Sequence, residues 1–384
     1  MYVTETSLPH LLRPQDYHAI EVFHRERELL KNSWHVVGTT AELGRDGDFI
    51  TTEVCDVPLQ VRNFDGQLKA LSNVCAHRHC LINSLPKGNS ASMRCQYHGW
   101  EYRADGRTGR IPEPKNFIPF DRERLCLPSY HVEQIGQLVL INLSSAPTPI
   151  QEVLGNDFHA FLAERFGDQW RLALRWQPDY AANWKVPIEN SLEAYHVPAV
   201  HPKTFKVDPG EQKSEHLLLK NRTAFMAMLP FAAHSRVDEL FQSLEGRVVR
   251  SLGYKETRQY SQHHVFPNLL FSFTDAISLC QCILPTGPTT CRSVVRQFSR
   301  MPMNRPTLTP LARIWGGLTS SLNKHILKED RQLFGSIQKG LEHSPHSGIL
   351  GRCEERLHAF QCFMQTQLRS QSVAASLESE IPRP

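Results

Sequence analysis

Cysteine and histidine occur together twice within one short stretch of this sequence. Cys75 is followed two residues later by His77, and Cys95 is followed three residues later by His98. Seventeen residues separate the two motifs, so the pattern reads C-x-H and then C-x-x-H. Thiolates and imidazoles are common ligands of transition metals in proteins. We therefore interpret these four residues as the ligands of a metal site.

Two kinds of site use two cysteines and two histidines. One is a tetrahedral zinc site, although zinc fingers usually pair cysteine with cysteine and histidine with histidine. The other is a Rieske [2Fe-2S] centre, in which two cysteines hold one iron and two histidines hold the second. Here each motif supplies one cysteine and one histidine, on what the pattern predicts to be two hairpin tips. This arrangement favours the Rieske centre over zinc.

A second group of metal-binding residue types lies in the stretch "NWKVPIENSLEAYHVPAVHP". Glu193 and His196 are three residues apart and would share one face of a helix. We expect Pro198 to end that helix, and His201 follows on the turn. Two imidazoles and one carboxylate form the facial triad of non-haem Fe(II) oxygenases, which leaves coordination positions open. H-x-x-x-x-H alone is a weak signal, and the upstream Rieske motif strengthens it.

The elements that must position these residues follow from the sequence pattern. A small all-β unit is expected over residues 40–147, with a hairpin turn at Asp65-Gly66 between two strand-like runs. The Ser/Pro-rich stretch "SSAPTPIQEVL" marks a joint. A helix is expected at residues 18–35, and beyond the joint the pattern predicts helices at 152–166, 183–197 and 307–342 and strands at 218–230 and 262–299.

These patterns predict an α+β fold class, a small all-β Rieske domain plus a larger antiparallel-sheet domain flanked by helices. The expected boundaries are a helical N-terminal segment (1–40), the Rieske [2Fe-2S] domain (41–147), the mononuclear iron catalytic domain (148–372) and a flexible tail (373–384).

Composition narrows the class of protein. The 384 residues carry a net charge of +4 without any block of like charges, which does not indicate nucleic-acid binding. The N-terminus lacks the apolar region of a signal peptide, and no apolar run is long enough to span a membrane. We therefore expect a cytoplasmic protein, whose ten cysteines are free thiols or metal ligands rather than disulfides.

Nearly the whole chain resembles the catalytic α subunit of Rieske non-haem iron ring-hydroxylating oxygenases, the shorter α3-type members in particular. The likeness is carried by "FHRERELLKNSWHVVG", both Cys-His motifs, "NWKVPIENSLEAYHVPAVHP" and "FPNLLFSF". The resemblance implies that His196 and His201 share iron with a late aspartate. "HILKEDRQLFGSIQKGL" matches that segment, with Asp330 as the expected ligand and the adjacent Glu329 as the alternative.

The resemblance also implies a role for Glu193. Family members keep a carboxylate three residues before the first iron-binding histidine, and it links two metal sites across a subunit interface. Glu193 is thus expected to bridge His98 of one subunit and His196 of the next in a homotrimer. The chain departs from the family pattern in having His79 and Cys80 where Gly commonly follows the "HR" pair, and Glu rather than Asp at the bridge.

The function implied is that of a terminal oxygenase. Its cofactors would be the Rieske cluster and mononuclear Fe(II), with O₂ as cosubstrate and NAD(P)H electrons from a separate reductase, with or without a ferredoxin. It would hydroxylate or N-demethylate a small organic substrate, with quaternary ammonium or methylated amine compounds as one class and aromatic acids as the alternative. Two alternatives remain at this stage: a Rieske electron carrier without oxygenase activity, and a zinc-bound interaction protein.

Overall fold

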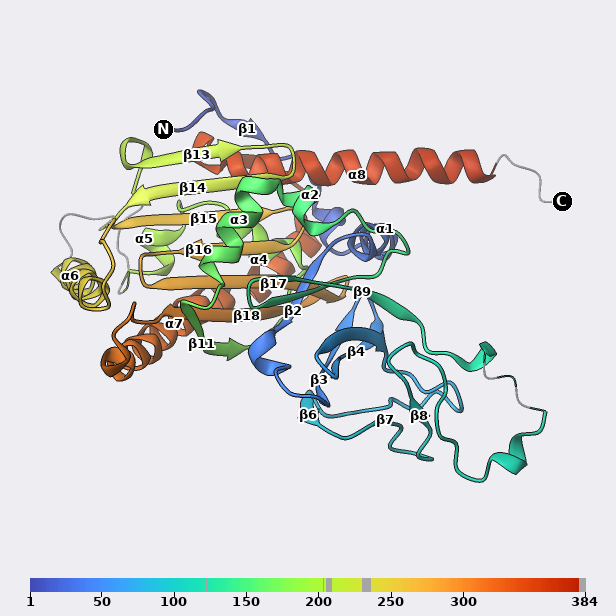
Figure 1. Ribbon diagram of the computed structural model, residues 1–384. Coiled ribbons are helices and arrows are strands. Elements are labelled where there is room, and N and C mark those ends of the chain that lie inside the picture. The colour runs from blue at the N-terminus through green and yellow to red at the C-terminus, as the bar shows by residue number, and fades with distance from the viewer. Residues whose placement is uncertain (120, 122, 203, 205–208, 230–235, 380–384) are drawn as a thin grey trace. The chain divides into compact units, whose positions relative to one another are not determined.

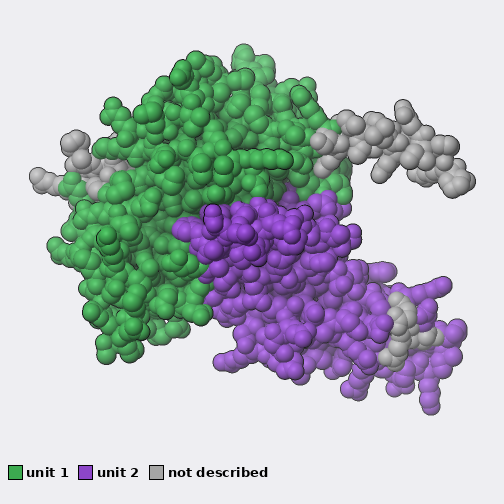
Figure 2. Space-filling model, turned by 45° about the horizontal axis from the view of Figure 1, so that its top comes forward, with its two compact units in different colours: residues 1–29, 164–384 green, residues 30–163 purple. Residues whose placement is uncertain are grey.

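The computed structural model describes residues 1–119, 121, 123–202, 204, 209–229 and 236–379. The chain forms two compact units, which Figure 2 colours separately. One unit consists of Leu30–Ala163, and the other combines Met1–Leu29 with Glu164–Pro384. Both boundaries expected for the Rieske domain, at residues 41 and 147, lie inside the smaller unit.

The smaller unit is built on a seven-stranded antiparallel sheet with the strand order β2-β10-β9-β5-β4-β3-β6. Its strands are β2 (His35–Thr39), β3 (Asp48–Val54), β4 (Val57–Phe64), β5 (Gln67–Ser72), β6 (Lys87–Asn89), β9 (Ser129–Ile135) and β10 (Leu138–Asn142). A separate pair consists of β7 (Met93–Arg94) and β8 (Glu101–Tyr102). The predicted hairpin between β4 and β5 is confirmed, because Asp65 and Gly66 form its two-residue turn with φ of 50° and 84°.

The larger unit contains an eight-stranded sheet in which β11-β18-β17-β16-β15-β14-β13 follow one another and β12 also pairs with β18 (Figure 1). These strands are β11 (Trp170–Trp176), β12 (Asp179–Tyr180), β13 (Ser214–Leu218), β14 (Arg222–Met228), β15 (Gln259–Val265), β16 (Leu269–Phe273), β17 (Ile277–Gly287) and β18 (Thr290–Arg300). A small pair joins β1 (Leu8–Pro9) to β19 (Ile349–Leu350). All pairings are antiparallel, so the predicted α+β class with an antiparallel catalytic-type sheet is confirmed.

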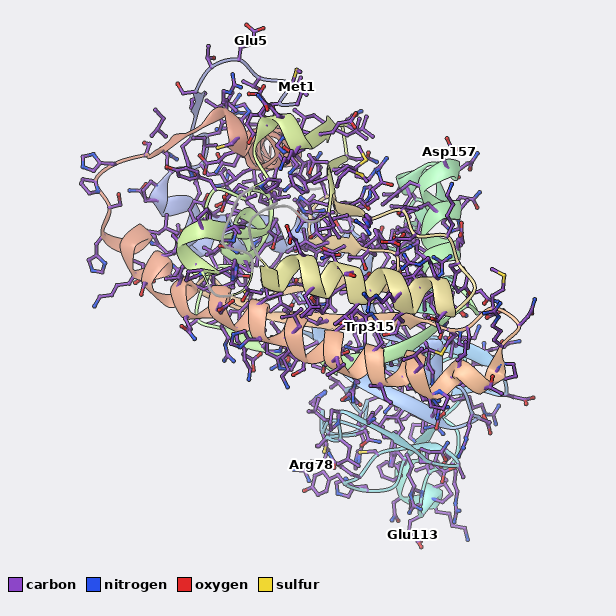
Figure 3. The ribbon with its side chains drawn as sticks, turned by 90° about the vertical axis from the view of Figure 1, so that its left-hand side faces the viewer. Met1, Glu5, Arg78, Glu113, Asp157 and Trp315 are labelled. Carbon is purple, nitrogen blue, oxygen red and sulfur yellow. The ribbon has the colours of Figure 1, made fainter. Side chains whose placement is uncertain are left out.

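The helices are α1 (Ile20–Lys31), α2 (Ile150–Leu154), α3 (Asn156–Arg165), α4 (Lys185–Ser191), α5 (Val197–Val200), α6 (Arg236–Ser251), α7 (Thr309–His343) and α8 (Glu355–Ser379). Helix α7 packs against β18, β11 and α4. Figure 3 shows α6 and α7 side by side around Trp315, whose ring stacks on Phe241 with centroids 5.2 Å apart. None of the helices that the structure describes is both long and apolar enough for a membrane span.

Three features of these helices differ from the sequence-based expectation. The predicted helix at 183–197 is two helices, and Pro198 lies in the first turn of α5 rather than ending α4, because a residue without an N–H fits the first turn. Gly155, with φ of 77°, divides the predicted helix at 152–166 into α2 and α3. Helix α8 continues through Ser379 inside the segment expected to be a tail, and residues 380–384 lie outside the described residues.

Candidate metal centres

The two Cys-His motifs form loops with the same backbone hydrogen bonds. The amide of Cys75 donates to the carbonyl of Cys80 (2.9 Å), and the amide of Cys95 donates to that of Trp100 (2.8 Å). In each loop the amide four residues after the cysteine also donates to the carbonyl of that cysteine. The His79 amide donates to Cys75 at 3.0 Å, and the Gly99 amide donates to Cys95 at 3.0 Å. Both loops therefore hold their cysteines in matching positions, whereas His77 follows its cysteine by two residues and His98 follows its cysteine by three.

The side chains of these loops converge. The rings of His77 and His98 are 4.7 Å apart between centroids, and His77 stacks on Trp100 at 4.7 Å. Cys75 and Cys95 are each 2 % exposed. Burial raises the pKa of Cys75, which neighbours Cys95, and the hydroxyl of Tyr102 lies 3.1 Å from the Cys75 Sγ. The structure thus brings all four predicted residues of this site together.

These residues fit a Rieske [2Fe-2S] cluster. The Nδ1 atom of His77 is buried and has no hydrogen-bond partner among the described residues, although a buried nitrogen of this kind normally has one. Burial is the main reason that the pKa of His77 is lowered, so the ring is held in the neutral form that binds metals. Two sulfur and two nitrogen donors are the set that this cluster requires.

The residues around these ligands depart from the family pattern without disturbing the loops. His79 adopts a left-handed φ of 59°, at the position equivalent to Gly99 with φ of 70°. Cys80 is partly buried, and its Sγ lies 3.3 Å from the carbonyl of Leu81. Tyr97 is exposed, and its ring lies against the ring of His98.

The second group of residues converges in the larger unit. One ligand-type atom from each of His196, His201 and Asp330 lies within 4.8 Å of the others. The Oδ1 atom of Asp330 is 3.0 Å from the Nε2 of His201 and 3.5 Å from the Nε2 of His196. That oxygen is buried without a hydrogen bond to the described residues. Two imidazole nitrogens facing one unsatisfied carboxylate oxygen fit a mononuclear Fe(II).

The helices place these three candidate ligands from distant parts of the chain. His196 precedes α5, His201 follows it, and Asp330 comes from the middle of α7. Helix α4 leads into this loop and is anchored in the interior, since the Lys185 ammonium binds Glu26 at 2.6 Å and the Trp184 indole donates to the same carboxylate. Removing Glu26 would leave the buried ammonium uncompensated, so this pair fixes the start of α4.

Two carboxylates hold the outer nitrogens of the two histidines. Glu193 accepts hydrogen bonds from the backbone amide and the Nδ1 of His196. Glu329 accepts from the Nδ1 of His201 at 2.8 Å. A carboxylate only accepts, so each Nδ1 carries the proton and each Nε2 presents its lone pair to the site. Glu329, the alternative ligand in the sequence analysis, thus contacts the outer nitrogen of His201.

The electrostatics of His201 follow from the same contacts. Burial disfavours its protonation, but Asp330 and Glu329 together outweigh burial and raise the pKa of His201 above its ordinary value. Without metal the site thus attracts a proton to this ring. The same negative charge favours a divalent cation, because the cation can take the place of the proton.

A cavity of about 480 Å³ opens beside His196, His201 and Asp330. Its lining includes one face of the sheet, where alternate residues of the strands face inward, together with parts of α6 and α7. Sequence reasoning missed three charged or polar residues in this wall, namely Arg356, Glu245 and Gln262. The signal for this wall was a pair of polar residues, Ser272 and Gln281, within largely apolar strands.

Comparison with known proteins agrees with this architecture. The family model described as "Ring hydroxylating alpha subunit (catalytic domain)" matches residues 167–370, and the "Rieske [2Fe-2S] domain" model matches residues 33–131. A quaternary ammonium Rieske monooxygenase has the same fold, with a TM-score of 0.73 at 22% identity over 94% of this chain and 95% of that one. Naphthalene 1,2-dioxygenase from Rhodococcus sp. superposes with a TM-score of 0.71 at 17% identity over 94% of each chain.

Curated relatives are similar over part of their length. The glycine betaine monooxygenase oxygenase subunit of Pseudomonas aeruginosa is 32% identical over 187 residues, which is 48% of this chain and 42% of that protein. The carnitine monooxygenase oxygenase subunit of Acinetobacter pittii is 31% identical over 195 residues, 48% of this chain and 51% of that protein. The chain thus matches about half the length of these relatives. Since the catalytic-domain model spans more than half of the sequence, the protein belongs to the ring-hydroxylating α-subunit family.

Proposed function

We propose that the protein is the terminal oxygenase of a Rieske non-haem iron oxygenase system. It would use O₂ and electrons from a separate NAD(P)H reductase to hydroxylate or N-demethylate a small organic substrate. The observation that carries this proposal is the meeting of His196, His201 and Asp330 at a cavity large enough for such a substrate. An electron carrier would need no cavity beside that group.

Cys75, His77, Cys95 and His98 would hold the [2Fe-2S] cluster, and His196, His201 and Asp330 would hold the mononuclear iron. When bound, the cluster supplies single electrons and the iron supplies the position at which O₂ is activated. The chain itself contributes the geometry. Glu193 and Glu329 fix the tautomers of both iron-binding histidines, and the enclosing walls exclude water from the reacting substrate.

The substrate class is proposed from the relatives and from the cavity. Relatives named for glycine betaine and carnitine suggest a methylated ammonium compound. A relative named as the anthranilate 1,2-dioxygenase large subunit of Acinetobacter baylyi keeps an aromatic acid as the second candidate. Both candidates are small enough for the cavity.

Assembly is proposed to be a homotrimer in which Glu193 of one subunit contacts His98 of the next. His98 is exposed within the smaller unit, so its ring is accessible to a second chain. Inter-subunit electron transfer is named for the quaternary ammonium monooxygenase of the same fold. A reductase, with or without a ferredoxin, would deliver the electrons, and a cytoplasmic location stays a prediction.

A single-turnover assay tests the function. The protein is loaded with iron, its cluster is reduced chemically, and O₂ is added with glycine betaine, carnitine or anthranilate. Formaldehyde release together with a demethylated product identifies an N-demethylase, and one added oxygen on the intact skeleton identifies a hydroxylase. If the reduced cluster is not reoxidised by O₂ in the presence of any substrate and no product forms, the oxygenase function is wrong.

A further inference from the structure

Arg356 is a buried cation in the wall of the cavity. It lies in the first turn of α8, and it is 1 % exposed. Both of its Nη atoms donate to the Oε1 of Gln262 at 3.1 Å, and Nη2 also reaches the carbonyl of Ser191 at 3.5 Å. Its Nε is buried without an acceptor in the described part of the chain. Its hydrogen-bond acceptors are thus neutral oxygens.

The nearest carboxylates are engaged elsewhere. Glu193 accepts from His196, and Glu355 accepts from the amides of Val3 and Thr4 and from the ring of His216. Burial lowers the pKa of Arg356 to about 10, against the opposing effect of Tyr260 and these two glutamates. The guanidinium therefore stays charged at neutral pH. A buried charge whose hydrogen-bond acceptors are all neutral is unfavourable, so the cavity beside it favours an anionic guest.

Gln262 connects this charge to the cavity. A guanidinium only donates, so the atom of Gln262 that faces it must be the oxygen, and the amide nitrogen points away. No hydrogen bond to that nitrogen occurs among the residues that the structure describes. Gln262 pairs with Phe225 on one side and Ser272 on the other, and all three residues line the cavity. The sheet therefore presents the Gln262 N–H groups to the bound molecule.

We propose that Arg356 and Gln262 form a subsite that binds a carboxylate group of the substrate. Gln262 would donate to the carboxylate directly. Arg356 would position the Gln262 amide and supply the compensating charge behind it. This proposal rests on the proposed function, because it specifies the substrate of the same cavity.

The same cavity contains a buried carboxylate for a cationic end. Glu245 is 4 % exposed, and its Oε1 accepts from the Thr274 hydroxyl and the Ala276 amide. Its Oε2 is buried with no partner in the described ranges. Burial raises the pKa of Glu245, with Arg165 as a nearby cation that opposes the shift. An ammonium group entering the cavity would favour the ionised form.

The residues that contact the two charged groups, Gln262 beside Arg356 and Thr274 beside Glu245, lie near each other, as a short zwitterion requires. Gln262 pairs with Ser272, and Thr274 lies two residues further along the same chain direction. Strand geometry places the Cα atoms of Gln262 and Thr274 about 8 Å apart. The aromatic rings of Phe241 and Phe273 also line this cavity, and ring faces attract cations. Among carboxylates, the structure thus favours a methylated ammonium carboxylate over an aromatic acid.

Binding measurements on the iron-loaded protein, without reductant, test this subsite independently of turnover. Calorimetry compares γ-butyrobetaine, its methyl ester and benzoate. The Gln262→Glu variant keeps an oxygen for Arg356 but turns the donor into a carboxylate. Its Kd for γ-butyrobetaine should rise on the order of 30-fold, because one hydrogen bond to a charged group is lost. Its Kd for the methyl ester should stay unchanged. Gln281→Glu is the matched control, since Gln281 lines the same cavity on β17, two strands from Gln262 on β15, and it should have a smaller effect.

Glu245→Gln tests the part of the cavity that would hold the ammonium group. It should weaken the binding of γ-butyrobetaine without weakening the binding of benzoate. If the wild-type protein binds the ester as tightly as the acid, or if Gln281→Glu matches Gln262→Glu, the carboxylate subsite is overturned. Tight binding of benzoate without binding of γ-butyrobetaine would overturn the inference that the substrate is a zwitterion. If γ-butyrobetaine binds tightly, and Gln262→Glu weakens that binding, but the compound is never oxidised, the result supports the subsite and contradicts the proposed function.

Discussion

At the scale of single residues, the two candidate centres differ in how their imidazoles are held. Glu193 and Glu329 each bind an Nδ1, so the Nε2 atoms of His196 and His201 face Asp330. In the smaller unit the unsatisfied atom is instead an Nδ1, that of His77. The contacts of each ring thus leave a different nitrogen available to a metal.

Asp330→Ala should deplete the mononuclear iron and leave the cluster in place. The substitution removes the carboxylate oxygen that both Nε2 atoms face, and Asp330 belongs to the larger unit whereas the Cys-His loops belong to the smaller one. Iron content by mass spectrometry, beside the visible absorption of the cluster, checks both halves. Glu329→Ala is the control, because loss of a residue that orients a ligand weakens metal binding about 10–100-fold. Full iron occupancy in Asp330→Ala would instead make Glu329 the ligand.

Cys75→Ser should abolish the visible absorption of the cluster. A hydroxyl is a poor substitute for a buried thiolate as a ligand of iron–sulfur clusters. Cys80→Ser provides the comparison, since Cys80 is close in sequence but only partly buried and contacts a carbonyl. An unchanged spectrum in Cys75→Ser would remove this residue from the ligand set, and a colourless wild-type protein would favour zinc.

At the scale of elements, the two Cys-His loops share a fold but not a sequence. His79 and Gly99 both adopt a positive φ, because each sits where the chain turns back to its cysteine carbonyl. Glycine adopts this conformation without cost, whereas other residues lose about 1–2 kcal/mol in it. His79 is therefore a place where the chain accepts strain.

His79→Gly should raise the thermal unfolding midpoint of the cluster-loaded protein, by relief of about 1 kcal/mol of backbone strain. Gly99→Ala, at the equivalent position, should lower it, since the added Cβ meets the same backbone cost and approaches Arg94 at 2.8 Å. Circular dichroism melts of both variants measure the pair. A lower midpoint in His79→Gly would mean that the imidazole makes a stabilising contact that outweighs the strain.

The sequence predicted those elements whose residues carry local signals. The Asp65-Gly66 hairpin and the long helix α7 follow from turn chemistry and from helical periodicity. It did not predict helices α6 and α8, or the break between α4 and α5. Nor could it predict the wall of the cavity, because Gln262 and Arg356 are 94 residues apart and meet only through the packing of α8 on the sheet. Metal ligands can be predicted from the spacing of short motifs, whereas the residues that line a substrate cavity have no regular spacing in the sequence.

At the scale of the whole molecule, buried neutral histidines make stability depend on pH. Burial lowers the pKa of His35 in the smaller unit to about 4, and that of His264 in the larger unit to about 3. A histidine with a depressed pKa contributes stability above its unfolded value near 6.5. That stability is lost as pH falls towards the folded pKa, because the unfolded chain takes up the proton.

Stability should accordingly fall by about 1.4 kcal/mol per pH unit for each such histidine below pH 6.5. Urea unfolding at pH 7, 6 and 5 measures this slope. His264→Gln should make the slope shallower, and His346→Gln, at an exposed position, should not change it. Equal slopes in the wild type and in His264→Gln would show that His264 titrates normally in the folded protein.

The proposed trimer gives the last prediction, which concerns electron transfer between subunits. Cys75→Ser lacks the cluster and Asp330→Ala lacks the mononuclear iron, so each variant alone should be inactive. If His98 of one subunit serves His196 of the next through Glu193, mixed trimers restore activity. In a closed ring of three chains that contains both variants, about one in three adjacent pairs combines an intact cluster with an intact iron site in the right order. Co-expression from differently tagged copies, with turnover measured on the doubly purified trimers, should therefore yield activity.

Adding Glu193→Gln to both copies should abolish that activity while both metals remain bound. Inactive mixed trimers would instead place electron transfer within one chain and leave Glu193 as a residue that only orients His196.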